Sequence, residues 1–555
     1  KCQHIRFLEI LEMYEMNLKE SLFPEQSDAD LWDIPVGELL RDIAATYPCS
    51  EAVVEVDENG DRALCLTYQE VLDTSERLAV ALGTRFGRGE KIVVWAPNIS
   101  QWIILEYACA LAGLVVVTAN PSFQEPELRY VLEQSGATGL FLVDNYRGNP
   151  MREIAHKAIK GNSVVKEMTN LLDSDALYWR AGETNQLPDI PPSDPAQIQY
   201  TSGTTGFPKG AVLSHNNLVN NARLFCKRKK VGQHSIWANF MPLFHTAGCA
   251  TGTLGCLQAA CRMILIQGFD ANVLAKIIEQ EGITTFFAVP TMLVGLLEAI
   301  EIQPRNMKSL EVISTGGAPV APELVRQVRT KLGCHLLTAF GQTEASPMIS
   351  LNHDDVTLDD ICETAGQPLP RTAVSIRSPE TNSVLPLNTV GEICAKSYGV
   401  MIGYHDNPEA TEAAIDNNNW LHTGDLGMMD LRGFIRVTGR VKDMIIRGGE
   451  NHFPAEIESV MLEHSAVNEI AIVGLPDPEW GEIIAAFIRT ESVGALKADE
   501  LKVHCRTFLS PQKTPTKWVV VDEFPMTGSG KVQKFAIREK WLSGKYGVEI
   551  HDNSN

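Results

Sequence analysis

The chain has 555 residues, more than a single hydrophobic core usually organises, so two or more domains are expected. Apolar residues make up 44% and charged residues 21%, which is typical of a globular protein and excludes a disordered one. With 48 Lys and Arg against 69 Asp and Glu, the formal net charge is −21. This charge disfavours a nucleic-acid binder but not the binding of small anions by local backbone N–H groups.

The longest apolar stretch runs from Trp102 to Thr118 and contains Glu106 in its interior and Gly113 near its end. A membrane helix needs about 20 apolar residues without a charge. The stretch therefore predicts a buried helix to Ala112, a helix cap at Gly113 and a strand to Thr118, with no transmembrane segment. The chain begins at Lys1 rather than Met, so we expect that a targeting segment before it would not be visible.

Short apolar runs that alternate with helical patterns predict buried strands of a parallel α/β fold. One helix is expected at Ala271 to Glu281, closed by Gly282. The expected strands are Ile92–Trp95, Leu140–Val143, Thr285–Val289, Val312–Ser314 and Leu336–Ala339.

The composition changes after Gly439, where a charged run from Arg440 to Asp443 begins. A helical pattern at 455–463 and strand patterns at 470–473, 484–488 and 519–521 follow. They predict a separate α+β domain of roughly a hundred residues. The charged run is either a hinge between the domains or an ordinary surface turn.

Twelve cysteines are scattered from Cys2 to Cys505, and none forms a Cys-x-x-Cys pair. We interpret them as reduced, mostly buried thiols in a reducing compartment, either cytoplasm or an organelle matrix. A structural zinc site is disfavoured by the same spacing.

The strongest local motif is Tyr200-Thr-Ser-Gly-Thr-Thr-Gly-Phe-Pro-Lys-Gly210. Small residues allow the backbone to approach a phosphate, and successive N–H groups form a cradle for an anion. Hydroxyl groups and Lys209 add donors and a positive charge. A Gly-rich run is otherwise a flexible linker, but the Pro-Lys pair at its end favours a structured phosphate loop.

Three shorter motifs lie downstream, and each has an ordinary alternative. Glu344 closes an apolar strand and could hold Mg²⁺, although a Glu at a strand end is more often simply solvated. Asp425 in Thr423-Gly-Asp could accept both ribose hydroxyls, or the motif could be a turn. Lys531 follows Gly528-Ser-Gly530 and would otherwise be an exposed turn lysine.

Together and in order, these motifs resemble the adenylate-forming superfamily, in its branch of acyl-CoA synthetases similar to medium-chain fatty-acyl-CoA ligases. The resemblance covers about Leu39 to Arg538. The segments that carry it are Tyr200–Gly210, Pro242–Gly248, Gly316–Ala318, Phe340–Glu344, Trp420–Asp425, Gly439–Asp443, Gly448–Glu458 and Pro525–Lys531.

The resemblance implies an α/β fold in two parts. Residues 1–439 would form an AMP-binding domain of two packed sheets with helices and a closing β-subdomain. Residues 440–555 would form a mobile α+β domain that rotates about Lys442 between two half-reactions. In the first, a carboxylic acid and ATP give acyl-AMP and pyrophosphate, and in the second CoA displaces AMP. Mg²⁺, ATP and CoA are the implied cofactor and co-substrates, and the oligomeric state stays open, a homodimer included.

The resemblance also assigns residues to roles. Catalytic roles fall on Lys531, His245, Thr343 and Glu344. Phosphates would be held by Thr201, Ser202, Gly203, Thr204, Thr205, Gly206 and Lys209, and Mg²⁺ by Thr204 and Glu344. The rest of AMP would contact Gly317, Ala318, Phe340, Gly341, Gln342, Asp425 and Arg440. Gly449 would line the CoA tunnel, and Phe240, His245, Gly248 and Gly317 the acyl pocket.

The assignments of Phe340 and His245 depend on the resemblance in different ways. Phe340 stands where the family commonly has Tyr, so it keeps a face for stacking adenine but lacks the hydroxyl group. Without the resemblance, His245 would be more often a core histidine than a catalytic one.

The acid is predicted from residues 236–269, which contain no Asp or Glu and only Arg262 as a formal cation. Amino-acid-activating relatives place an Asp here, because a buried ammonium group without a partner is costly. An apolar acid is therefore expected, with a medium-chain fatty acid favoured and an aromatic or alicyclic acid second.

Other functions remain as alternatives. A stand-alone adenylating enzyme could deliver its acyl group to an acceptor other than CoA. A nonribosomal adenylation domain would be followed by a carrier domain, and none is expected before Asn555. A luciferase-like oxygenase shares the motifs, whereas a non-catalytic binding protein is disfavoured because every position expected to do chemistry is filled.

Overall fold

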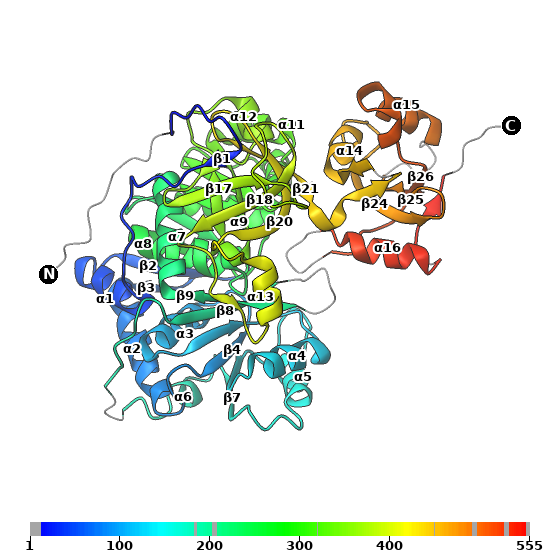
Figure 1. Cartoon of the computed structure of the whole chain (residues 1–555). Coiled ribbons are helices and arrows are strands. Elements are labelled where there is room, and N and C mark those ends of the chain that lie inside the picture. Colours follow the sequence, from blue (N-terminus) through cyan, green and yellow to red (C-terminus); the bar gives the residue numbers. More distant parts are fainter. Residues whose placement is uncertain are drawn as a thin grey trace.

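The computed structural model describes residues 13–182, 186–201, 208–318, 320–448, 450–490, 497–526, 532–544 and 546–550. Its larger part contains three β-sheets with helices around them, and its smaller C-terminal part contains a fourth (Figure 1). This arrangement confirms the expected α/β fold with a closing β-subdomain and an α+β C-terminal part.

A nine-stranded sheet forms one half of the larger part, and its strands from β14 to β2 are parallel. In sheet order they are β16 (Gln367–Pro368), β15 (Met348–Leu351), β14 (His335–Gly341), β13 (Val312–Gly316), β12 (Thr285–Ala288), β10 (Ile236–Asn239), β11 (Arg262–Leu265), β2 (Glu51–Val56) and β3 (Arg62–Thr67). The carboxyl ends of adjacent parallel strands meet at one edge, where ligands bind in α/β sheets.

A seven-stranded sheet forms the other half, with parallel strands from β8 to β7 and two antiparallel strands at one edge. Its order is β19 (Gly403–Tyr404), β9 (Lys209–Ser214), β8 (Pro195–Thr201), β5 (Val115–Thr118), β4 (Lys91–Trp95), β6 (Gly139–Leu142) and β7 (Glu167–Asn170). The strands expected at 92–95, 140–143, 285–289, 312–314 and 336–339 are thus confirmed within a few residues in these two sheets.

Helices pack around both sheets. They are α1 (Val36–Thr46), α2 (Tyr68–Gly83), α3 (Ser100–Ala112), α4 (Glu125–Ser135), α5 (Met151–Ala158), α6 (Ser174–Leu177), α7 (His215–Arg228), η1 (Ala247–Leu254), α8 (Gly255–Ala259), α9 (Ala271–Glu281), α10 (Pro290–Ile302), α11 (Pro322–Gln327), η2 (Val328–Leu332), η3 (Thr343–Ala345), α12 (Leu358–Glu363) and α13 (Pro408–Ala414). Helix α9 has the expected bounds, and Gly282 ends it in a left-handed conformation.

The apolar stretch from Trp102 folds as predicted. Helix α3 is buried on nearly all sides, Gly113 follows it in a left-handed conformation and β5 comes next. A helix that is apolar all round belongs in the interior of a large protein or in a membrane. Among the described residues, no helix is both long and apolar enough to cross a membrane.

A five-stranded antiparallel sheet, the closing β-subdomain, follows the nine-stranded sheet in the chain. Its order is β1 (Leu22–Phe23), β17 (Thr372–Arg377), β18 (Gly391–Ser397), β20 (Leu421–Met429) and β21 (Ile435–Arg440). The short turn η4 (Val441–Asp443) leads from β21 to the C-terminal part.

The C-terminal part is built on a six-stranded sheet in the order β23 (Glu450–His452), β22 (Ile445–Arg447), β25 (Gly481–Arg489), β26 (Lys517–Val520) and β27 (Val548–Glu549), with β24 (Glu469–Asp477) on the other side of β25. Its helical segments are α14 (Pro454–Met461), α15 (Ala498–Phe508), η5 (Pro511–Lys513) and α16 (Lys534–Leu542). In the described part of the chain, each hydrophobic cluster lies wholly before or wholly after Arg440. The division at 439/440 itself stays a prediction.

The described cysteines are all free, and most are buried, Cys226 and Cys261 among them. This agrees with the expectation of reduced thiols.

Candidate active site

The predicted phosphate loop connects two paired strands. β8 and β9 are antiparallel, and Thr201 lies opposite Lys209 in their register. The hydroxyl group of Thr201 donates a hydrogen bond of 3.4 Å to the Lys209 carbonyl oxygen. The two ends of the motif are therefore closed against each other. Ser202, Gly203, Thr204, Thr205 and Gly206 lie outside the described residues.

Glu344 and Lys209 are brought together by a tyrosine from a third segment. The Tyr404 hydroxyl group donates a hydrogen bond of 2.7 Å to Oε1 of Glu344. Lys209 Nζ lies 5.0 Å from the centre of the same ring. Burial raises the pKa of Tyr404, and the nearby Glu344 carboxylate raises it further, so the phenol stays protonated and donating.

The predicted adenine-binding residues follow two adjacent strands. Gly317 and Ala318 come directly after β13 and are exposed, and Gly341 ends the neighbouring β14. A Cβ atom on Gly341 would lie 2.1 Å from the Pro347 carbonyl oxygen, so only glycine fits here. Gln342 continues the turn, with its N–H donating to the same carbonyl oxygen at 2.8 Å.

Phe340 is only 8% exposed and belongs to the hydrophobic cluster beneath the five-stranded sheet. Its ring therefore has a packing role in this structure. Adenine stacking by Phe340 stays a prediction.

Asp425 and Arg440 form the next pair. They are opposite each other in the β20–β21 register, and Arg440 Nε lies 3.0 Å from Oδ1 of Asp425. Asp425 is 7% exposed, whereas the Arg440 side chain is about half exposed at 46%. The arginine can thus reach solvent and a ligand while it holds the carboxylate.

Positive charge gathers next to this pair. Burial lowers the pKa of Lys442 on η4, and the positive charges of Lys209 and Arg440 lower it further, while Asp443 acts in the opposite direction. The charge of Lys209 thus acts on Lys442, although the two residues belong to different parts of the chain. Three crowded cations favour an anionic ligand, because its charge relieves their repulsion.

His245 lies after the carboxyl end of β10 and is half-buried. Its Nδ1 accepts a hydrogen bond of 3.1 Å from the Ala247 backbone N–H. In the neutral ring the proton is therefore on Nε2. The π-helix η1 follows at once, and π-helical turns are frequent at functional sites.

The two other predicted pocket residues of this segment are packed tightly. The Phe240 ring is buried between Phe269 and Phe286, with ring centres 5.5 Å away in each case. A Cβ atom on Gly248 would lie 2.2 Å from the Pro242 carbonyl oxygen. A larger residue at 248 would thus disturb the backbone rather than project into a pocket. The pocket role of these residues stays a prediction.

Thr343 begins η3 beside Glu344. Gly449 and Lys531 lie outside the described residues, and their predicted roles stay predictions.

Sequence reasoning missed three polar residues that support this site. Tyr404 orients Glu344, Glu392 accepts a hydrogen bond from Gly424 in the Thr423-Gly-Asp425 turn, and His422 contacts Glu392. Two of them lie near sequence features that could have drawn attention: His422 directly precedes that turn, and Tyr404 follows Gly403 in a short apolar run. The sequence alone did not indicate which residues they contact.

The arrangement combines the Glu344 carboxylate held by Tyr404, the Asp425 carboxylate held by Arg440, and two lysines, one of which ends the predicted phosphate loop. Such a set can bind a nucleotide polyphosphate with a metal ion and neutralise charge during transfer at phosphorus.

Comparison with known proteins identifies the family. Residues 40–405 match the family model described as AMP-binding enzyme, and residues 456–531 match the AMP-binding enzyme C-terminal domain. YngI of Bacillus subtilis (strain 168) is 35% identical over 93% of this chain and 98% of its own length. The mitochondrial medium-chain acyl-CoA ligase ACSF2 of Bos taurus is 33% identical over 91% of this chain and 87% of its own.

Solved structures agree with this result. ATP-bound MatB from Rhodopseudomonas palustris superimposes with a TM-score of 0.83 at 26% identity, covering 92% of this chain and 100% of that one. The o-succinylbenzoate CoA synthetase MenE from Bacillus subtilis, in complex with its acyl-adenylate intermediate, gives a TM-score of 0.80 at 27% identity, covering 93% of this chain and 100% of that one. The chain belongs to the AMP-binding enzyme family and is an AMP-forming acyl-CoA synthetase, with a carboxylic acid, ATP and CoA as its substrates.

Proposed function

We propose that this synthetase activates an apolar carboxylic acid, with a medium-chain fatty acid favoured. The observation that carries the proposal is the position of the one formal cation in the predicted acid-binding segment. Arg262 lies opposite Ile236 at the amino ends of β11 and β10, where it pairs with Glu51 at 2.8 Å. His245 follows the opposite ends of these strands. Arg262 is thus neutralised and directed away from the proposed acid site.

The carboxyl group of Glu106 on α3, near η1, is held in its protonated form. Glu106 is 3% exposed and accepts a hydrogen bond from Gln197, and burial raises its pKa well above the usual range. Its nearest titratable neighbours include Cys249 on η1, whose pKa burial also raises. Neither Glu106 nor Cys249 therefore offers a charge to bind an ammonium group or a second carboxylate of the acid.

An aromatic or alicyclic acid is the second candidate. Its aromatic ring has a parallel in the acid of the o-succinylbenzoate CoA synthetase, although that acid also carries a second carboxylate. Both kinds of acid suit an apolar pocket.

In the proposed first half-reaction, an oxygen of the acid's carboxylate attacks the α-phosphorus of ATP and pyrophosphate leaves. Thr201 to Lys209 would hold the β- and γ-phosphates, and Asp425 with Arg440 would hold the ribose. Lys531 would contact the acid's carboxylate and the α-phosphate, and Thr343 the same phosphate. Because two anions meet in this step, cations that neutralise the developing charge supply much of the catalysis.

Magnesium fits this site. Tyr404 takes one oxygen of Glu344 and leaves the other to a metal, and Mg²⁺ is commonly held by one or two carboxylates with phosphate oxygens and waters. Glu344 and Thr204 would hold the ion, which would neutralise phosphate charge when bound. Tyr404 contacts both Glu344 and Lys209, and we expect the phosphates to lie near these two residues.

In the proposed second half-reaction, the CoA thiolate attacks the acyl carbon and AMP leaves. His245 would border the acyl carbon, and Gly449 would line the path of the thiol. We propose that residues 440–555 rotate about Lys442 between the steps, which removes Lys531 and admits CoA. The position of η4, directly after Arg440 and before the C-terminal part, suits such a hinge. A reducing compartment, cytoplasm or an organelle matrix, suits the free thiols.

The acid preference is tested with Phe240→Leu, which shortens a buried side chain after β10. If Phe240 lines the pocket, relative kcat/KM over a series of fatty and aromatic acids should move toward longer or bulkier acids by about tenfold. Phe141→Leu in β6 is the matched control, since Phe141 is equally buried but lies in the other sheet.

Two results would contradict parts of this proposal. An unchanged acid profile in folded Phe240→Leu would remove Phe240 from the pocket. A parent enzyme that prefers acids with a second charged group would refute the apolar substrate itself.

A further inference from the structure

The turn that carries Asp425 is a bulge in the antiparallel ladder of β18 and β20. Glu392 lies opposite Leu426, and Cys394 lies opposite His422. Between these pairs β18 contributes Ile393 alone, whereas β20 contributes Thr423, Gly424 and Asp425. The excess residues cannot pair in register with β18, so this part of β20 leaves that ladder, while Asp425 stays opposite Arg440 of β21.

A bulge leaves backbone groups without ladder partners, and side chains satisfy them here. Oε1 of Glu392 accepts a hydrogen bond of 3.0 Å from the Gly424 N–H. The Thr423 hydroxyl group donates to the Ile393 carbonyl oxygen at 2.6 Å and accepts from the Asp425 N–H at 3.1 Å. Gly424 has a φ of +70°, which an L-residue rarely adopts, so the bulge depends on both the glycine and these bonds.

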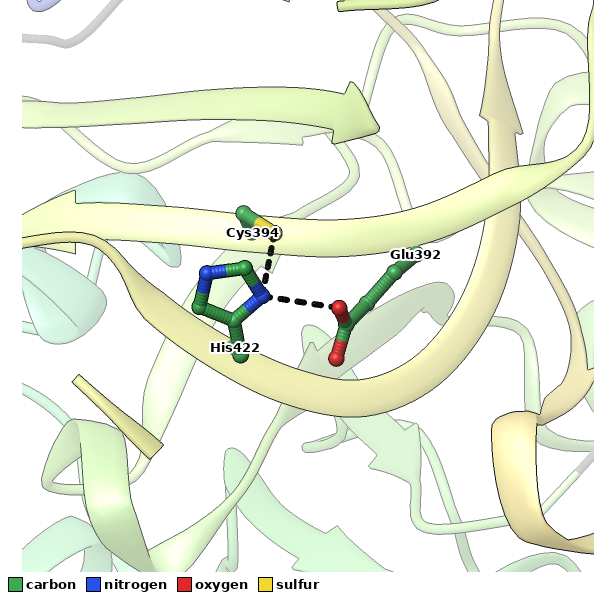
Figure 2. Close-up of side chains that lie close together, drawn as sticks. All are labelled: Glu392, Cys394 and His422. Carbon is green, nitrogen blue, oxygen red and sulfur yellow. Dashed lines mark hydrogen bonds and ion pairs between the residues drawn. The ribbon is translucent and has the colours of Figure 1, made fainter. Parts of the chain in front are cut away.

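The second oxygen of the Glu392 carboxylate is held by a histidine. Oε2 lies 2.8 Å from Nδ1 of His422, the residue that opens the bulge (Figure 2). His422 Nε2 faces Asp416 at 3.8 Å. The Glu392 carboxylate thus links His422 to Gly424, the two residues on either side of Thr423. The three segments involved are β18, β20 and the connection after α13.

The neighbouring carboxylates favour the protonated form of His422. The hydrogen bond to Glu392 raises the pKa of His422 despite burial, and the carboxylates of Glu392 and Asp416 raise it further, while Arg377 on β17 acts in the opposite direction. The fourth facing group, Cys394, is fully buried, and burial raises its pKa, so it is a neutral thiol.

Glu392, Cys394 and His422 are also residue types that bind metal ions, and their ligand atoms lie close together. The contacts favour a hydrogen-bonded support instead. His422 Nδ1 faces both Glu392 at 2.8 Å and the Cys394 sulfur at 3.5 Å, while the other Glu392 oxygen is occupied by Gly424 (Figure 2). A metal ion would need a thiolate, and the surroundings of Cys394 disfavour one.

We propose that Glu392 and His422 are positioning residues for the ATP ribose site. They act through Asp425, because they fix the backbone of the bulge to which Asp425 belongs. The inference rests on the proposed binding of the ribose hydroxyls by Asp425, and it adds two residues that contact neither ATP nor the acid.

The test compares ATP with 2′,3′-dideoxy-ATP in acid-dependent pyrophosphate exchange. Glu392→Ala should raise KM for ATP by about tenfold, as expected for the misplacement of one charged hydrogen-bonding group, with kcat changed much less. With dideoxy-ATP the same variant should differ from the parent by about twofold or less, since the contact is already absent. Glu392→Gln keeps an acceptor for the Gly424 N–H and should recover most of the affinity.

Two reference variants distinguish the proposed ribose role of Asp425 from the proposed positioning role of Glu392. Asp425→Ala should show the same dependence on the ribose hydroxyls, and Glu380→Ala, an exposed residue between β17 and β18, should match the parent. If Asp425→Ala affects both nucleotides equally, the proposed ribose role fails and the inference fails with it. If Asp425→Ala discriminates but Glu392→Ala does not, the positioning role alone is overturned.

Glu392→Ala could fail to fold, and His422→Gln then provides the comparison. It removes the imidazole contact with Glu392 but leaves Glu392 to bind the bulge, so we expect a rise of about threefold in KM for ATP and none for dideoxy-ATP. An equal rise for both nucleotides would overturn the proposal.

Discussion

Asp425 and Arg440 face each other across β20 and β21, with Arg440 Nε 3.0 Å from Oδ1 of Asp425. The pair lies at the last residue of β21, directly before the turn that leads to the C-terminal part. The proposed nucleotide site and the proposed hinge therefore share one short segment of backbone.

The first prediction concerns this pair. Asp425→Ala should raise KM for ATP by about tenfold or more, because it removes the proposed ribose contacts and leaves Arg440 without its carboxylate. The measurement is KM for ATP in pyrophosphate exchange, with Asp355→Ala, an exposed residue, as control. An unchanged KM in folded Asp425→Ala would remove the residue from the nucleotide site.

The second prediction concerns Glu344. Glu344→Gln should shift the magnesium dependence of adenylation to higher concentrations, since the amide binds Mg²⁺ less well than a carboxylate. Tyr404→Phe keeps the ring over Lys209 but removes the hydrogen bond to Glu344, so a smaller shift in the same direction is expected. Magnesium titrations of both variants check this, and curves of Glu344→Gln that coincide with the parent's would refute the metal role.

The third prediction concerns Lys531. Lys531→Ala should slow adenylate formation by about 10² or more, as is typical for the loss of a charge contact in the transition state. Thioester formation from supplied acyl-AMP should be nearly unchanged. Lys497→Ala is the control, because Lys497 is exposed and pairs with Glu500 of the neighbouring helix α15. Equal losses in both half-reactions would argue against the role.

The fourth prediction concerns the hinge. Proline fixes its own φ and disfavours a helical conformation of the residue before it, and Val441 begins the helical turn η4. Lys442→Pro should therefore hold the link in one arrangement and reduce one half-reaction far more than the other. Lys442→Ala, which leaves the backbone free, is the control.

Gly449→Leu approaches the same question from the CoA path. It should reduce thioester formation and leave pyrophosphate exchange near normal, because the side chain would block the thiol and not ATP. Equal effects of Lys442→Pro on both half-reactions, together with no selective effect of Gly449→Leu, would contradict domain alternation.

Much of the fold could be predicted from local patterns. Apolar runs such as the one before Trp95 gave buried strands, and α9 was bounded by its periodicity and by Gly282. The order of the strands could not be predicted in this way. The pairing of β10 with both β11 and β12 depends on long-range packing that no local pattern records.

In the candidate site, too, local motifs could be predicted from the sequence, whereas long-range contacts could not. Residues inside motifs, such as Asp425 and Glu344, could be selected from sequence because a resemblance supplied their roles. Tyr404 could not, because it reaches Glu344 only through the pairing of β19 with β9. Gly248 was expected to border the acyl pocket, but the direction of its Cβ toward Pro242 follows from the π-helix, which the sequence did not predict.

The most direct test of the whole account is product stoichiometry. The enzyme is supplied with ATP, Mg²⁺, CoA and a medium-chain fatty acid, and nucleotides, pyrophosphate and thioester are measured together. We expect AMP, pyrophosphate and acyl-CoA in equal amounts, each dependent on the acid, with acyl-AMP and pyrophosphate alone when CoA is omitted. Formation of ADP and phosphate, or release of acyl-AMP without thioester in the presence of CoA, would contradict the account.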